Sequence, residues 1–134
     1  MLSGILLPTT LAMAAAAALA NVWLAMRIGR IRRAESIGVG DGGHELLTRR
    51  MRAQLNFAEN TPWVLALVLT IELAGKGGRW LPIVAALYIV GRIAHALGMD
   101  GGGFKTGRMI GTAVTLLAQV GLALVAVAIL AKAL

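Results

Sequence analysis

Long apolar stretches alternate along this chain with short polar or glycine-rich connections. Three apolar stretches are long enough to cross a membrane as helices: Ile5 to Met26, Trp80 to Leu97 and Ile110 to Leu130. The hydrocarbon core of a bilayer is about 30 Å thick and a helix rises about 1.5 Å per residue, so roughly 20 apolar residues are sufficient. The pattern therefore predicts at least three membrane-spanning helices.

A fourth apolar stretch, Thr61 to Ala74, is too short to cross a membrane alone. It becomes long enough if its helix begins near His44 and includes the polar segment in between. At about 100° per residue, five polar side chains of that segment fall within an arc of roughly 80°. They are Glu45, Arg49, Arg52, Asn56 and Glu59. We therefore predict one helix with a polar stripe leading into its membrane-buried half.

Glycine-rich segments at 37–43, 75–78 and 100–103 separate the predicted helices, and no stretch has the alternation of a strand. Asp41 is placed to cap the second helix. Basic residues follow the first apolar stretch instead of preceding it, so we interpret that stretch as a retained helix. The prediction is an all-α integral membrane four-helix bundle, one domain over 1–134, with spans at about 4–27, 44–74, 80–98 and 108–132.

Composition supports a membrane protein and restricts its chemistry. The chain is 58% hydrophobic and only 14% charged, far from the balance of a soluble domain. Because it has no cysteine, any thiol chemistry must come from a bound ligand. No metal site is predicted, since His95 has no second ligand at a useful spacing.

The net charge of +7 is distributed unevenly. Ten of the thirteen basic residues lie in or near the first and third connections: Arg27, Arg30, Arg32, Arg33, Arg49, Arg50, Arg52, Arg92, Lys105 and Arg108. By the positive-inside rule, both connections are cytoplasmic and both termini lie outside. Membrane lipid headgroups, and not nucleic acid, are the partners that this distribution predicts. At the other interface, Glu72 and Lys76 are expected to form an i, i+4 pair.

The third span repeats the polar theme, with Tyr88, Arg92 and His95 on one face. Ionisable groups at this depth are costly unless they face protein or water. One interpretation is a cationic pocket near the cytoplasmic surface, completed by Arg108. The other is structural: Arg52 or Arg92 pairs with Glu59, and Asn56 makes an interhelical hydrogen bond. The residue pattern leaves both interpretations open.

The segment Arg52-Ala-Gln-Leu-Asn-Phe-Ala-Glu59, followed by Pro62, closely resembles the signature of the MAPEG family, the membrane-associated proteins of eicosanoid and glutathione metabolism. Gly91-Arg-Ile-Ala-His95, with Arg108 thirteen residues after His95, is similar to the prostaglandin synthase branch. The loop Ser36 to Gly43 resembles the bacterial branch. The resemblance covers nearly the whole chain, and it implies a homotrimer in a bacterial cytoplasmic (inner) membrane.

The resemblance also implies glutathione as thiol substrate or cofactor, held near the cytoplasmic face between subunits. It assigns Arg108 to stabilisation of the thiolate. The implied glutathione-binding residues are Arg30, Arg52, Gln54, Asn56, Glu59 and His95. Asn60, Met99 and Met109 stand where the family commonly has tyrosine, tyrosine and serine, so thiol activation would depend mainly on Arg108.

The implied function is a glutathione transferase or peroxidase that conjugates or reduces a lipophilic small molecule. One alternative is a non-catalytic membrane protein that binds glutathione, another anionic ligand or a lipid in the same pocket. A small multidrug transporter is a third class. That class is disfavoured because the first span has no acidic residue and the chain is only 4% aromatic.

Overall fold

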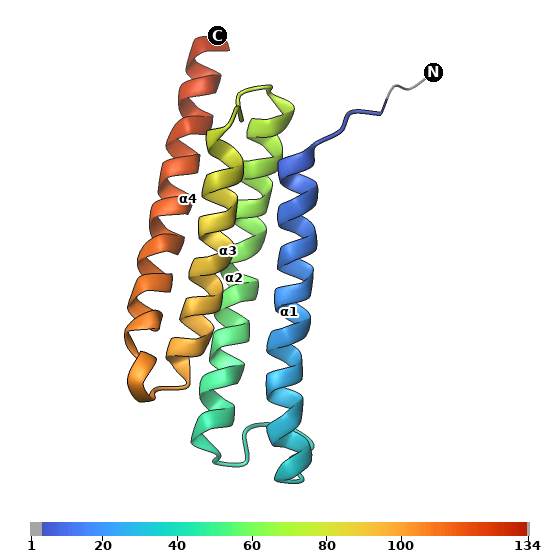
Figure 1. Cartoon of the computed structure of the whole chain (residues 1–134), viewed down its shortest axis with the longest axis vertical. Coiled ribbons are helices and arrows are strands. Elements are labelled where there is room, and N and C mark those ends of the chain that lie inside the picture. The colour runs from blue at the N-terminus through green and yellow to red at the C-terminus, as the bar shows by residue number, and fades with distance from the viewer. Residues whose placement is uncertain (1–3, 134) are drawn as a thin grey trace.

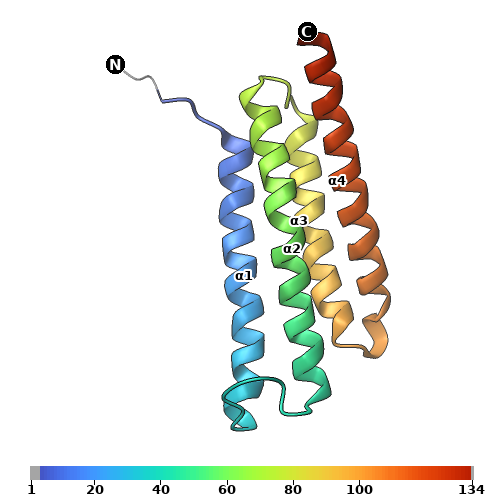
Figure 2. The same ribbon diagram turned by 180° about the vertical axis from the view of Figure 1, so that it is seen from behind.

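The computed structural model describes residues 4–133 and shows four helices joined by short connections (Figures 1 and 2). The helices are α1 (Pro8–Ala34), α2 (Glu45–Leu73), α3 (Trp80–Met99) and α4 (Thr106–Ala133), with a 3₁₀ turn η1 (Gly102–Phe104) before α4. They run alternately up and down. The predicted all-α bundle is confirmed, and residues 4–133 contain no strand.

The first helix differs from the predicted span at both ends. Gly4 to Leu7 are not helical, because the residue before a proline is biased away from helical geometry and Pro8 is well suited to the first turn. At the other end α1 continues to Ala34 instead of stopping at 27. Arginine and alanine are good helix formers, so the added turns are polar but still helical.

The start of α2 corrects the capping prediction. His44, not Asp41, is the N-cap, and its Nδ1 accepts a hydrogen bond from the Leu47 amide at 3.2 Å. The Asp41 carboxylate instead accepts from the Gly43 amide at 3.0 Å and from the Thr48 hydroxyl at 2.8 Å. Asp41 thus orders the connection that precedes the helix.

Glycines allow α3 and α4 to pack with their backbones in contact. A Cβ atom added to Gly98 would collide with backbone atoms of Gly107 and Arg108, and one added to Gly111 would collide with the Gly91 carbonyl oxygen and with His95. Small residues permit such close approach between membrane helices. The consequence is that the first turns of α4, including Arg108, lie directly beside the last turns of α3.

Two buried clusters fill the bundle. One is built around Val64, Val68, Leu81, Tyr88 and Leu122, toward the end where the termini lie. The other, made mostly of α1 and α2 residues, contains Ala17, Leu24, Ala53, Phe57 and Ala96.

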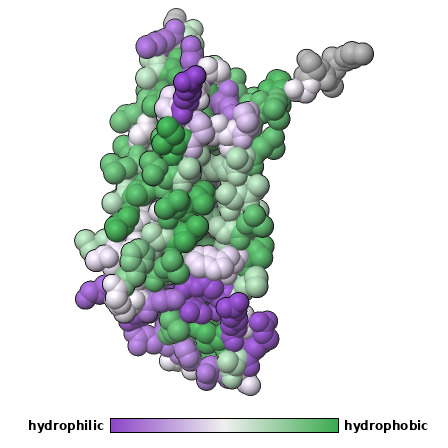
Figure 3. Space-filling model, in the orientation of Figure 1, coloured by the Kyte–Doolittle hydropathy of each residue, from purple (hydrophilic) through white to green (hydrophobic). Residues whose placement is uncertain are grey.

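Three of the helical segments are long and apolar enough to cross a membrane: Pro8–Ala34, Trp80–Met99 and Gly102–Ala133. The exception is α2, whose first half carries the predicted polar stripe, yet α2 runs alongside the other three (Figure 1). On the face drawn in Figure 3, hydrophobic residues cover the middle, and hydrophilic residues gather at the end with the α1–α2 and α3–α4 connections. We call this end the arginine-rich end and the opposite one, where both termini lie, the terminal end.

Candidate functional site

The buried guanidinium of Arg92 joins three helices. Arg92 lies on α3, is 3% exposed, and donates a hydrogen bond to the Thr115 hydroxyl of α4 at 2.8 Å. It also donates to the side-chain oxygen of Asn56 on α2, and it lies 3.3 Å from Nδ1 of His95. The predicted interhelical hydrogen bond of Asn56 is confirmed, but its partner is a cation that no carboxylate in residues 4–133 neutralises.

A second polar contact lies one turn farther along the same helices. The Gln119 side chain of α4 donates to the backbone oxygen and to the side-chain oxygen of Asn60, at 3.3 and 3.1 Å. Asn60 also donates to the Asn56 backbone oxygen at 2.7 Å. Asn56 and Asn60 therefore mark the side of α2 that faces α4.

Charged side chains lie at the outer border of this contact. Arg52 and Glu59 share the Asn56 side of α2, and both are exposed. Arg108 is also exposed, and it precedes Thr115 and Gln119 by seven and eleven residues, close to whole numbers of helical turns. It therefore lies on the side of α4 that contacts α3 through Thr115 and α2 through Gln119. We use the name α2–α4 face for the positions Arg52, Asn56 and Glu59 of α2 together with Arg108 of α4.

The predicted ligands Gln54 and Arg30 lie elsewhere. Gln54 donates to Asn21 of α1 at 3.4 Å and lines a groove of about 600 Å³, the α1–α2 groove. The groove residues are Asn21, Ile28, Arg32, Met51, Arg52, Gln54, Leu55 and Ala58. Arg30 is exposed on α1 and is not among them. Because α1 and α4 are on opposite sides of the bundle (Figure 1), the predicted site residues do not share one surface. Gln54 lines the α1–α2 groove, Arg52 belongs to the groove and to the α2–α4 face, and Arg30 lies on neither.

Sequence reasoning missed Arg32 as a groove residue. Its signal was present, since Arg32 follows Asn21 by eleven residues and so shares its side of α1, whereas Arg30 is about 200° away from Arg32 around the helix. The alternative pairing of Glu59 with Arg52 or Arg92 is not among the three ion pairs in residues 4–133.

The single tyrosine of the chain belongs to the core. Tyr88 is fully buried, and its hydroxyl shares a hydrogen bond of 2.9 Å with the Thr61 hydroxyl. A buried and satisfied hydroxyl cannot reach a ligand on the α2–α4 face. In residues 4–133, no three His, Asp or Glu side chains lie close enough together to hold a metal ion.

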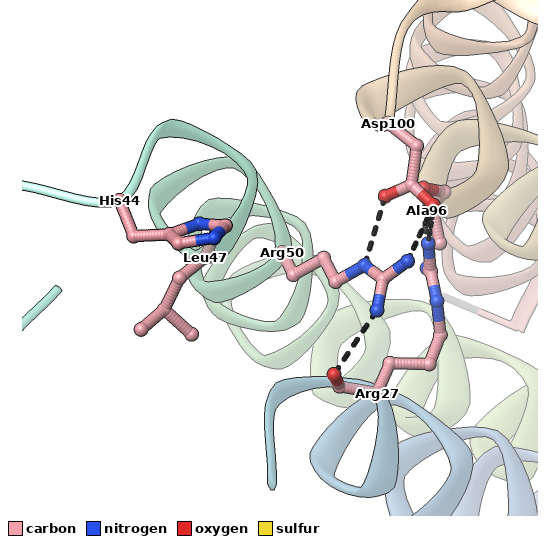
Figure 4. A network of polar contacts seen from close by, with 6 residues as sticks. All are labelled: Arg27, His44, Leu47, Arg50, Ala96 and Asp100. Carbon is pink, nitrogen blue, oxygen red and sulfur yellow. Dashed lines mark hydrogen bonds and ion pairs between the residues drawn. The ribbon is translucent and has the colours of Figure 1, made fainter. Parts of the chain in front are cut away.

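A carboxylate at the arginine-rich end holds the helices around the site in register. Asp100, just after α3, accepts from Arg27 of α1 and from Arg50 of α2 (Figure 4), the Arg50 contacts measuring 3.2 and 3.1 Å. Arg50 also donates to the Arg27 backbone oxygen, and Arg27 to that of Ala96. The two arginines also offset the unfavourable position of an acid at a helix C-terminus.

These features define a class: a helical membrane protein with a cationic polar site near one end of its bundle. The sequence profile of the MAPEG family matches residues 10–128, nearly the whole chain. The chain belongs to the MAPEG family, and membership supports a role in glutathione or eicosanoid metabolism. No curated protein matches the sequence in a direct comparison.

Proposed function

We propose that the chain is a glutathione-dependent transferase or peroxidase that acts on lipophilic electrophiles from the bilayer. One observation carries the proposal: Arg52, Glu59 and Arg108 are exposed next to a buried polar network in a bundle that is otherwise apolar. Exposed charges are costly next to hydrocarbon, so they indicate a polar ligand or a wet cavity at this point.

Glutathione carries charges that are complementary to those of the α2–α4 face. At neutral pH it carries two carboxylates and one ammonium, which arginines and one carboxylate complement. In the proposal Arg52 binds a glutathione carboxylate, Glu59 meets the ammonium, and Asn56 supplies an amide hydrogen bond. His95 is connected to Asn56 through Arg92, whose guanidinium contacts both His95 Nδ1 and the Asn56 side-chain oxygen.

Arg108 is proposed as the group that stabilises the thiolate. A thiol with a pKa of about 8.5 is only a few per cent ionised at pH 7, and a fixed positive charge beside the sulfur lowers that pKa. The thiolate then attacks an electrophilic carbon and forms a C–S bond, and either a leaving group departs or an activated double bond accepts the electron pair and takes up a proton. With a hydroperoxide the thiolate attacks the terminal oxygen, the O–O bond breaks and the alcohol leaves. A second glutathione then attacks the resulting sulfenic acid and gives the disulfide and water.

A second copy of the chain would complete the site. The α2–α4 face and the α1–α2 groove lie on different surfaces of one copy, yet the resemblance assigns residues of both to one glutathione. We propose a homotrimer in which the groove of one copy, with Gln54 and Arg32, meets the α2–α4 face of its neighbour, while Arg30 lies outside the groove on the same helix as Arg32. The proposed setting is a bacterial inner membrane with the arginine-rich end in the cytoplasm.

Ultraviolet difference absorbance of the solubilised protein, titrated with glutathione near neutral pH, tests the proposal. We expect a saturable thiolate band that disappears in Arg108→Ala and weaker binding in Glu59→Gln. Arg79→Ala, which removes an exposed cation at the terminal end, is the matched control and should leave the band unchanged. Binding without a band in the unmodified protein would favour the non-catalytic alternative, and no binding at all would reject glutathione as ligand.

A further inference from the structure

The terminal end carries a groove of about 630 Å³ between the α2–α3 turn and the last turns of α4. We call it the lysine groove, after two of the residues that line it. They are Ala74, Lys76, Trp80, Val125, Ala128, Ile129, Lys132 and Ala133. Val125, Ile129 and Trp80 pack against the buried core, so the apolar floor is anchored. The groove thus combines an apolar floor with two cations at its edge.

The two lysines have no acidic partner among the described residues. Neither takes part in any of the three ion pairs within residues 4–133. The predicted pairing of Lys76 with Glu72 is wrong, because Glu72 is engaged with α1. Its carboxylate accepts from the Thr9 amide at 2.9 Å and from the amide and hydroxyl of Thr10, both at 2.7 Å. Because the Glu72 carboxylate is bound at the start of α1, the ammonium of Lys76 has no ion-pair partner within residues 4–133. It can contact the anionic group of a ligand.

The groove lies at the depth of lipid headgroups. Lys132 follows Arg108 by 24 residues of one continuous helix, a distance of about 36 Å at 1.5 Å per residue. A hydrocarbon core of about 30 Å therefore fits between Arg108 and Lys132. Trp80 donates from Nε1 to the Lys76 backbone oxygen at 3.2 Å, and tryptophan is typical of the membrane interface.

We propose that the lysine groove binds an anionic glycerophospholipid from the leaflet at the terminal end. An acyl chain lies along Val125 and Ile129, while the ammonium groups of Lys76 and Lys132 contact the phosphate. A zwitterionic lipid binds less well because its own ammonium is repelled by the lysines. This site is at the opposite end from the α2–α4 face and does not depend on glutathione binding.

Quenching of Trp80 by brominated lipid tests the proposal. The parent protein carries Trp23→Phe and Trp63→Phe, so that Trp80 is the only tryptophan, and is placed in bilayers of brominated phosphatidylglycerol mixed with unlabelled phosphatidylcholine. We expect quenching above the level set by bulk composition. Lys76→Gln and Lys132→Gln should each weaken the preference for the anionic lipid about fivefold. Arg79→Gln, a cation beside the groove that does not line it, should leave the preference unchanged.

Four results would overturn the proposal. Quenching of the parent at the bulk level would mean that no lipid is preferred. An equal loss of the anionic-lipid preference in Arg79→Gln would mean that general surface charge, and not the lysine groove, attracts the lipid. Relief of quenching by inorganic phosphate would assign the lysines to a free anion. Protection of Trp80 from every brominated lipid would mean that protein covers the groove. Helical circular dichroism of each variant verifies that it has folded.

Discussion

Arg92 of α3 holds the side-chain amide of Asn56 on α2 in a single orientation. A guanidinium can only donate, so the Asn56 oxygen must face Arg92 and its amide nitrogen must point away from it. Thr115 supports the other side of the guanidinium. The buried cation therefore positions a donor on the α2–α4 face while it joins three helices.

Replacing Arg92 with lysine should lower stability although the charge is kept. A single ammonium cannot reproduce the planar fork that reaches Thr115 and Asn56 together, and a buried partner left unsatisfied costs about 1–3 kcal/mol. Thermal unfolding in detergent would measure the loss. Arg33→Lys, an exposed position near the end of α1, is the control. Equal unfolding temperatures for the two variants would contradict the bridging role.

Gly111→Ala should destabilise the bundle by several kcal/mol, or displace α4. The new methyl group would overlap the Gly91 carbonyl oxygen and the His95 side chain, and neither can move without shifting a backbone. Gly121→Ala on the same helix is the matched control, since nothing lies within 4 Å of its added Cβ. There alanine should be neutral or stabilise by up to about 1 kcal/mol. Indistinguishable unfolding temperatures would rule out the close packing of α3 and α4.

Asp100→Asn should cost about 1–3 kcal/mol, because it leaves the buried Arg27 and the half-buried Arg50 next to each other without a shared carboxylate. Glu45→Gln removes the ion pair with Arg49, which is exposed, and should change stability by less than about 0.5 kcal/mol. Denaturation of both variants in the same detergent gives the comparison. A larger loss in Glu45→Gln would show that the Asp100 cluster does not secure this end.

Acid should loosen the connection between α1 and α2. The Gly43 amide, followed by the Thr48 hydroxyl and the charge of Arg32, holds the pKa of Asp41 below its ordinary value of 3.8. A lowered pKa in the folded state means that the contribution is present above about pH 4 and is lost as pH falls through that lowered pKa. The Gly43 amide resonance, followed by NMR against pH, should report the transition. A variant with Asp41→Asn should lack it, and a persistent transition would assign it to another group.

Oligomers that mix two defective variants should recover the thiolate band of bound glutathione if two copies of the chain build each site. Gln54→Ala damages the α1–α2 groove, whereas Arg108→Ala damages the α2–α4 face. In an oligomer that contains both variants, the intact groove of the second can meet the intact face of the first. Co-reconstituted variants should therefore show a thiolate band that neither shows alone. No recovery in verified mixed oligomers would mean that one copy holds the whole site.

Residue pattern was sufficient to predict the membrane class, the number of helices and the extension of α2 through its polar segment. Membrane helices can be predicted from the sequence because the length of an apolar stretch and the glycine-rich breaks between stretches are local properties. The ends of α1 were predicted less well. The arginines after Met26 end the apolar stretch, and they led us to predict the end of the helix near residue 27. The helix can continue beyond its membrane-spanning part, as α1 does to Ala34.

The order of residues alone shows which charged groups are present: most of the arginines, with several acids among them, toward one end of an apolar bundle, and Lys76, Arg79 and Lys132 with Glu72 at the other. The contacts of each group follow only from how the helices pack. In the folded chain Glu72 binds the start of α1, and Lys76 lines the lysine groove. Arg32 lies in the α1–α2 groove, and Arg30 lies outside it. Partner choice depends on how helices are rotated and staggered against one another. That arrangement is set by packing at distant residues such as Gly98 and Gly107, which no local pattern specifies.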